Sequence, residues 1–249
     1  MKVASVQAVS AVQEDRQFIL ANGQRVLELA GKLKGKLSQL SVPEIAPSEI
    51  PRLLIQRADL VASISFSRVD LTIRPPEHVA GNYDSAMEFA ERTASPILEE
   101  LVHPERGYEW SGVVVELQFP LPGEGLPGLA HAAPLFDRLV RIDRRGRELA
   151  SFQLQFGFAE SDYFVNATVE GYETRQVDVE ARAAEKGAVR IDLSKQPITE
   201  SGIGLIVDIN NKPARTHQSA VNDVADLMRQ HRARLPGLLS DLGLEESSR

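Results

Sequence analysis

The chain contains no cysteine. Without a thiol there is no disulfide bond, no thiolate ligand for a metal ion and no cysteine nucleophile. A chain of 249 residues can bury a sizeable core without covalent cross-links. The absence of cysteine therefore fits a protein that folds in a reducing compartment, and we expect a cytoplasmic location.

Long apolar stretches are missing as well. After Met1 and Lys2, the polar residues Gln7, Ser10 and Gln13 interrupt the apolar core that a signal peptide needs. No run of about 18 apolar residues occurs, so the sequence predicts no transmembrane helix and no membrane partner.

An excess of positive charge is also absent. The chain has 28 Lys and Arg against 35 Asp and Glu, which gives a formal net charge of −7 at pH 7. General binders of nucleic acid or anionic membranes carry net positive charge, because they must neutralise phosphates. The composition therefore argues against nucleic acid as a partner.

Recognisable catalytic motifs are lacking. There is no P-loop and no G-x-S-x-G elbow. Gly123–Gly128 matches G-x-G-x-x-G, but prolines crowd this stretch and no β-α-β unit follows, so we interpret it as a loop. Asp192 with Lys195, and Asp208 with Lys212, lack the spacing of metal-dependent nucleases. We assign no catalytic residue, and we lean towards a protein that is not an enzyme.

The histidines give no metal-binding pattern. None of the five is paired at a spacing of two or four residues, so a metal site would need ligands from distant segments. His231 falls on the apolar stripe of the last predicted helix, where a hydrogen-bonded core histidine is the simpler interpretation. We therefore expect neither a metal nor a cofactor.

The composition is that of a globular protein, with 43% hydrophobic and 25% charged residues. We expect a single α+β domain over residues 1–249. The segment Val42–Pro51 contains three prolines, which are incompatible with a helix interior. It marks a boundary between elements, and a sub-boundary of the domain is possible there.

The hydrophobic periodicity predicts most elements of the first half. We expect a strand at Val3–Val12, a helix at Gln24–Leu40, two strands within Arg52–Arg74 and a helix at Asp84–Val102. The alternation between Leu60 and Ile73 slips near Arg68, which indicates a bulge or turn. Pro96 lies inside the second helix and is expected to kink it or divide it in two.

The second half is richer in strands. We expect strands at Gly112–Phe119, Glu148–Phe158, Tyr163–Val179, Ala188–Leu193 and Gly204–Ile209, with helices at Ala132–Val140 and Ser219–Leu235. Ser219 can cap the last helix. Hairpins and helices without strict β-α alternation predict an α+β fold, with antiparallel sheet(s), helices packed on one face and a long C-terminal helix.

Two groups of residues are candidates for binding a partner. The first is the densest basic cluster, which could grip an acidic partner or could simply be a solvated helix end: Arg138, Arg141, Arg144, Arg145 and Arg147. The second is the aromatic hairpin with Tyr163 and Phe164, which could anchor an interface or belong to the core. We therefore predict that a partner binds at Arg138, Arg141, Arg144, Arg145, Tyr163 and Phe164.

The segment His103–Trp110 concentrates polar side chains after a helix and holds the single tryptophan. It could line a pocket, since loops often carry function. The simpler interpretation is a helix-to-strand connection that is anchored by the Trp110 side chain.

Short segments of the chain resemble a sporadically distributed, uncharacterised bacterial protein family of similar length. They are Ile64-Ser65-Phe66-Ser67-Arg68, Asp162-Tyr163-Phe164-Val165-Asn166 and Leu205-Ile206-Val207-Asp208-Ile209-Asn210. The resemblance covers about the last three-quarters of the chain. It implies a bacterial accessory protein and supplies no catalytic residues.

The leading hypothesis is a non-enzymatic binding or scaffold protein that acts through another protein or through self-association. A small hydrophobic-ligand-binding protein is the first alternative, and it would require Phe119, Phe156, Val207 and Met228 to line an open pocket. A metal-dependent hydrolase or nuclease, with acids assembled by the fold, is the second.

Overall fold

The computed structural model describes residues 1–16, 23–43, 45–102, 107–121, 126–140, 145, 147, 149–176, 195–214, 217 and 219–244. Its strands are β1 (Lys2–Val12), β2 (Lys36–Gln39), β3 (Leu53–Arg57), β4 (Leu60–Ile64), β5 (Arg68–Ile73), β6 (Tyr108–Pro120), β7 (Gln153–Ala159), β8 (Phe164–Arg175) and β9 (Ile198–Asn210). Its helices are α2 (Gly23–Lys32), α3 (Glu77–Ala80), α4 (Tyr83–Leu101), α5 (Gly128–Leu139) and α6 (Ala220–Leu242).

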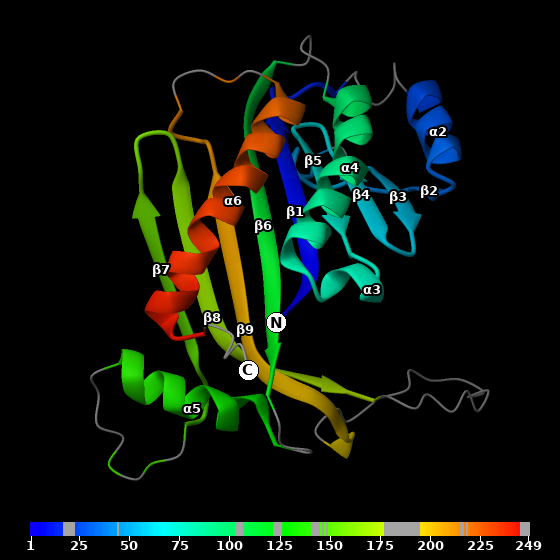
Figure 1. Ribbon diagram of the computed structural model, residues 1–249. Helices are drawn as coiled ribbons and strands as arrows, with labels where there is room; N and C mark the ends of the chain where they lie inside the picture. The colour runs from blue at the N-terminus through cyan, green and yellow to red at the C-terminus, as the bar shows by residue number, and fades with distance from the viewer. Residues whose placement is uncertain are drawn as a thin grey trace, which may run out of the picture. The chain divides into compact units, whose positions relative to one another are not determined.

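The strands form one antiparallel sheet in the order β2-β3-β4-β5-β1-β6-β9-β8-β7. Strands β1 and β5 are paired with Val6 opposite Ile73. Helices α4 and α6 pack against each other over the same face of β1 and β6 (Figure 1). The predicted α+β class, with helices on one face and a long C-terminal helix, is confirmed.

The segment predicted as two strands contains three. Arg57 and Leu60 pair across the turn between β3 and β4, and Ile64 pairs with Val69 across the turn between β4 and β5. The second turn lies where the alternation slips near Arg68. The first turn, at Arg57-Ala58-Asp59, separates the two strands that were expected, and the second divides the expected strand Leu60–Ile73 into β4 and β5.

The predicted helix Gln24–Leu40 is correct only in its first half. Helix α2 ends at Lys32, Lys34 takes a positive φ of 53°, and the following residues form β2. A Cβ atom added at Gly35 would lie 2.7 Å from Ile55 Cγ2, so glycine permits the close approach to β3. The apolar spacing continues through the turn, and it was therefore a poor guide to where the helix ends.

Both long helices begin at side-chain caps. Asn82 accepts a hydrogen bond from the Ser85 amide before α4, and Ser219 accepts one from the Asn222 amide before α6. The predicted Ser219 cap is thus confirmed. Pro96 lies inside α4, which is one helix rather than two. Helix α6 continues beyond Leu235 and ends at Leu242, where Gly243 adopts a left-handed φ of 57°.

Contacts divide the chain into two compact units. The first comprises Met1–Leu117, Gln155–Ala167 and Ile206–Arg249, and the second comprises Gln118–Leu154 and Thr168–Leu205. The Pro-rich segment 42–51 connects β2 to β3 within the first unit. In the second unit, a Cβ atom at Gly128 would lie 2.4 Å from the Tyr172 carbonyl oxygen, so glycine allows α5 to start directly against β8.

Arg52, just before β3, is an unusual member of the core of the first unit. It is only 7% exposed and lies over the Phe66 ring at 4.8 Å, with one hydrogen bond to the Ala46 carbonyl. Its Nε and Nη1 atoms are buried without a hydrogen-bond partner. A buried guanidinium with unpaired donors is destabilising relative to an apolar side chain of similar length.

Arg52→Met is therefore expected to raise the free energy of unfolding by about 1–2 kcal/mol in urea denaturation. The control is Arg57→Met, because Arg57 is partly exposed and pairs with Asp59, and it should change stability by less than about 0.5 kcal/mol. A loss of stability in Arg52→Met would show that the stacking on Phe66 outweighs the unpaired donors.

Candidate functional sites

The predicted basic cluster is described only in part. Arg138 lies in the last turn of α5 and Arg145 has a positive φ of 50°, and both side chains are exposed. A cation in the last turn is favourable for the helix dipole by itself. Arg141 and Arg144 lie outside the described residues, so binding by this cluster stays a prediction.

The two aromatic candidates differ in their surroundings. The Tyr163 hydroxyl donates to Asp226 Oδ2 on α6 at 2.6 Å, and the Arg234 guanidinium lies 5.5 Å from the ring centre. The hydrogen bond to Asp226, together with burial, raises the pKa of Tyr163 to about 12. Tyr163 therefore attaches the hairpin to α6. Phe164, the first residue of β8, is 39% exposed.

Strand β7 lies at one end of the sheet order, and it carries the more exposed phenylalanine. Phe158 is 57% exposed and packs edge-on against Phe156, with ring centres 5.8 Å apart. The strand sequence QLQFGFA has no charged residue and no proline. Edge strands usually carry such residues, which prevent pairing with another chain. Within its bounds, β7 lacks both.

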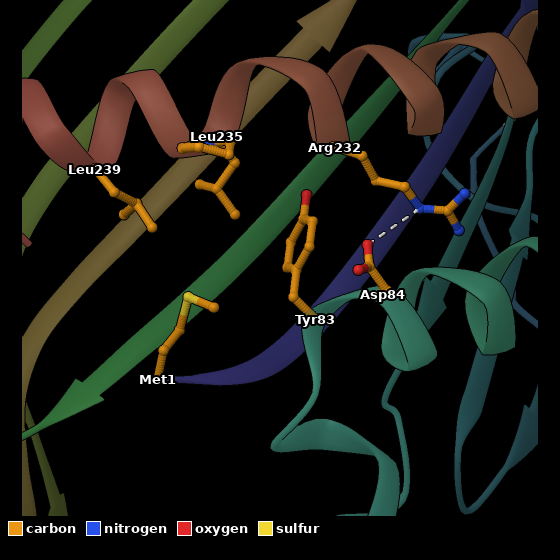
Figure 2. A pocket seen from close by; sticks show the side chains of 7 residues that line it. Met1, Tyr83, Asp84, Arg232, Leu235 and Leu239 are labelled. Atoms are coloured by element: carbon orange, nitrogen blue, oxygen red, sulfur yellow. Dashed lines mark ion pairs between the residues drawn. The ribbon is translucent and has the colours of Figure 1, made fainter. Parts of the chain in front are cut away.

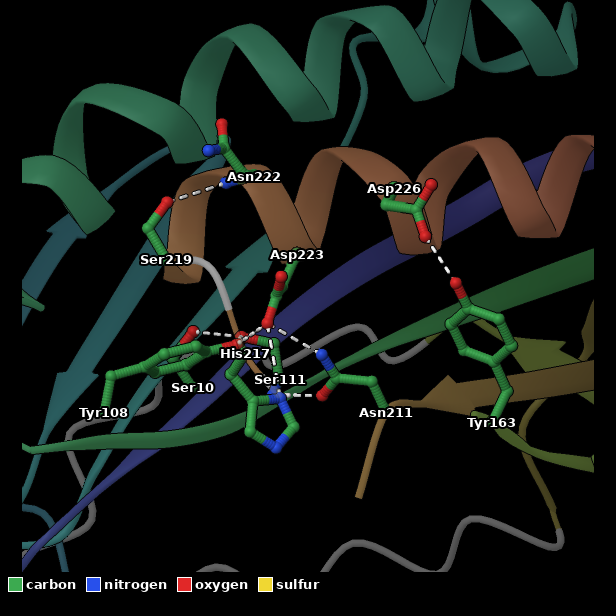
Figure 3. A network of polar contacts seen from close by, with 10 residues as sticks. All are labelled: Ser10, Tyr108, Ser111, Tyr163, Asn211, His217, Ser219, Asn222, Asp223 and Asp226. Atoms are coloured by element: carbon green, nitrogen blue, oxygen red, sulfur yellow. Dashed lines mark hydrogen bonds and ion pairs between the residues drawn. The ribbon is translucent and has the colours of Figure 1, made fainter. Parts of the chain in front are cut away.

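A polar network joins β1, β6 and Asn211, the residue that follows β9, to the start of α6 (Figure 3). The Tyr108 hydroxyl donates to Asp223 Oδ2 at 2.7 Å, and the Asn211 side-chain amide donates to the same oxygen at 2.8 Å. Tyr108 also contacts Ser111 Oγ at 2.9 Å, which lies 2.9 Å from Ser10 Oγ. Burial raises the pKa of Tyr108, so its hydroxyl keeps the proton that it donates.

His217 lies at the border of this network. Its Nδ1 atom is 3.4 Å from Asp223 Oδ2, a distance that fits an ion pair when the ring is protonated. Its ring lies edge-on to Tyr108. Asn211 further accepts a hydrogen bond from the Ser111 amide at 2.8 Å. The hydrogen bonds that Tyr108 and Asn211 donate to Asp223 attach α6 to the sheet, and we assign the network a structural role.

Sequence reasoning singled out Tyr108 but not the network itself. Tyr108 lies in the polar segment His103–Trp110 and is the first residue of β6. Asp223 gave no separate signal, although its place one turn after the Ser219 cap favours a carboxylate for the helix dipole.

A cavity of about 340 Å³ opens in the first unit between the two long helices (Figure 2). Its lining is Met1, Tyr83, Asp84, Arg232, Leu235, Pro236 and Leu239. In the close view, the Tyr83 ring stands between an apolar side, with Met1, Leu235 and Leu239, and a polar side formed by Arg232 and Asp84. Sequence reasoning did not identify this cavity.

The residues named as a test for an apolar pocket do not line the cavities that the structure describes. Val207 and Met228 are buried in the first unit, and Phe119 is buried in the second. A second cavity, of about 590 Å³, is bordered by Phe136 and Phe152 in the second unit.

Neither a metal site nor a membrane-spanning helix is present in the described parts of the chain. There, no group of three or more His, Asp or Glu side chains is placed to hold a metal ion. No described helix has the length and apolar character needed to cross a membrane. Asp208 instead accepts hydrogen bonds from the Asn166 and Asn210 side chains.

The fold and these sites define an α+β protein built on an antiparallel sheet, with an uncharged edge strand and a cavity between two helices. No family model matches the sequence, and neither does any curated protein.

Proposed function

We propose that the protein is a non-enzymatic, cytoplasmic binding protein that acts through a protein partner, and that the partner pairs with β7 and covers Phe158. The observation that carries the proposal is the combination of an edge position, an uncharged sequence and a phenylalanine that is 57% exposed. The family resemblance supports a role as a bacterial accessory factor.

The chemistry of an edge strand suits this role. Its outward amides and carbonyls can pair with an extended segment of a partner, which supplies affinity without any catalytic group. Aromatic side chains on the same strand supply the apolar anchor that dominates many interfaces. Gln155 and Gly157 are exposed and uncharged, so they oppose no partner by charge.

Phe158→Lys is expected to reduce partner recovery at least tenfold, because it removes the anchor and places a charge on the edge strand. The measurement is quantitative proteomics after gentle affinity purification from the native cells. The matched control is Leu27→Lys, an apolar side chain that is 54% exposed on α2, a helix that contacts β2 at the opposite end of the sheet order from β7.

The control should recover the same partner as the unchanged protein. Equal recovery by both variants would place the interface elsewhere. If the unchanged protein recovers no partner above background, the proposed function is wrong.

A further inference from the structure

The cavity between α4 and α6 has walls of two kinds. Leu235 and Leu239 follow each other one turn apart on α6, and together with Met1 they form an apolar side. The opposite side is polar, with Arg232 from α6 and Asp84 from the first turn of α4. A ligand that fits both sides must be apolar over most of its surface and polar at one end.

Hydrogen-bond donors at this cavity lack acceptors. The Tyr83 hydroxyl is buried and has no hydrogen-bond partner, and the same holds for Nε and Nη2 of Arg232. Burial raises the pKa of Tyr83, so the hydroxyl is a donor at neutral pH. An unpaired buried donor costs about 1–3 kcal/mol, which an added acceptor would offset.

The charge of Arg232 is already balanced. Its guanidinium lies 3.9 Å from Asp84 and 3.8 Å from Glu91, within ion-pair range but beyond hydrogen-bond length. An anionic ligand would meet two carboxylates around one guanidinium and would be repelled. A neutral acceptor would satisfy the donors without this repulsion.

We propose that this cavity binds a small, uncharged and largely apolar molecule that carries one hydrogen-bond acceptor, such as a carbonyl oxygen. The volume of about 340 Å³ lies at the lower end of the range of roughly 300–1,000 Å³ for ligand pockets, which limits the ligand to a small molecule. The site is independent of the β7 edge and of the partner proposed for it.

The test uses prodan, an uncharged naphthyl ketone whose emission moves to shorter wavelength in an apolar site. Titration with the full-length protein should give saturable binding with this shift. The comparison probe is 6-dimethylamino-2-naphthoate, which has the same ring system but a carboxylate in place of the ketone. It should bind at least tenfold more weakly because of Asp84 and Glu91.

Three variants locate the site. Tyr83→Phe should weaken prodan binding roughly 3- to 10-fold, as expected for one hydrogen bond, while thermal stability without ligand stays equal or rises. Leu239→Trp should abolish binding by filling the cavity. Tyr172→Phe is the matched control, because this tyrosine lies in the second unit and donates to Glu200; it should leave binding unchanged.

Absence of saturable prodan binding would overturn the proposal. An equal affinity for prodan in the unchanged protein and in all three variants would also overturn it. So would tighter binding of the carboxylate probe than of prodan. Because none of these variants changes β7, partner recovery in the native cells is a separate readout, and failure of one proposal can be told from failure of the other.

Discussion

Replacing Asp223 with alanine is expected to lower the free energy of unfolding by about 3–5 kcal/mol, measured by urea denaturation. Asp223 is 9% exposed, and its Oδ2 atom accepts hydrogen bonds from Tyr108 and Asn211. Alanine would leave both buried donors without an acceptor, and each would bear the cost of an unsatisfied polar group. It would also remove a negative charge from the first turn of α6.

The control is Asp241→Ala, on the exposed side of the same helix near its end, which should change stability by less than about 0.5 kcal/mol. A double-mutant cycle with Tyr108→Phe measures the coupling directly. Its coupling energy should be at least about 1 kcal/mol, because the two side chains share a hydrogen bond. Additive effects would contradict the network as the means of attaching α6.

The strands and helices were largely predictable, because burial on one face imposes a period on the sequence. Val3–Val12 and the closing helix follow that rule, and the structure has β1 at Lys2–Val12 and α6 from Ala220. The apolar spacing did not predict the end of α2. It continues through the turn at Gly35, because the apolar residues of α2 and of β2 follow compatible spacings. The spacing of apolar residues along the chain does not report that the backbone at Gly35 lies close to Ile55 of β3.

The candidate sites depend on contacts between distant residues, which periodicity does not report. Ser111 and Asn211 lie 100 residues apart in sequence yet share a hydrogen bond of 2.8 Å. Tyr83 and Arg232 likewise line one cavity only because α4 and α6 pack together. The aromatic hairpin could be predicted from the sequence, but the edge position of Phe158 follows only from the strand order.

The burial of His231 was correctly predicted from the sequence, and it makes the stability of the protein depend on pH. His231 was predicted as a hydrogen-bonded core histidine, and it is 1% exposed with Nε2 donating to the Val113 carbonyl at 2.7 Å. This prediction is confirmed. Burial, opposed by the Val113 hydrogen bond and reinforced by Arg234, lowers the pKa of His231 from 6.5 to about 4.

Acidification from pH 7 to pH 4 is therefore expected to destabilise the protein through His231 by about 3 kcal/mol, with about 2 kcal/mol lost by pH 5. In the unfolded chain the imidazole takes up a proton as the pH falls through 6.5, whereas the folded chain resists until about pH 4. Stability contributed by the neutral ring is thus complete above pH 6.5 and declines below it. The measurement is the free energy of unfolding in urea at half-unit pH steps.

His231→Gln keeps an amide donor for Val113 but removes the titrating group, so its stability should fall less steeply between pH 6.5 and 4 than that of the unchanged protein. His78→Gln, at an exposed position in α3, should leave the slope unchanged. Other groups titrate in this range, and the difference between slopes isolates the contribution of His231. Parallel curves for the unchanged protein and His231→Gln would mean that water or a shifted helix accommodates the charged ring in the folded state.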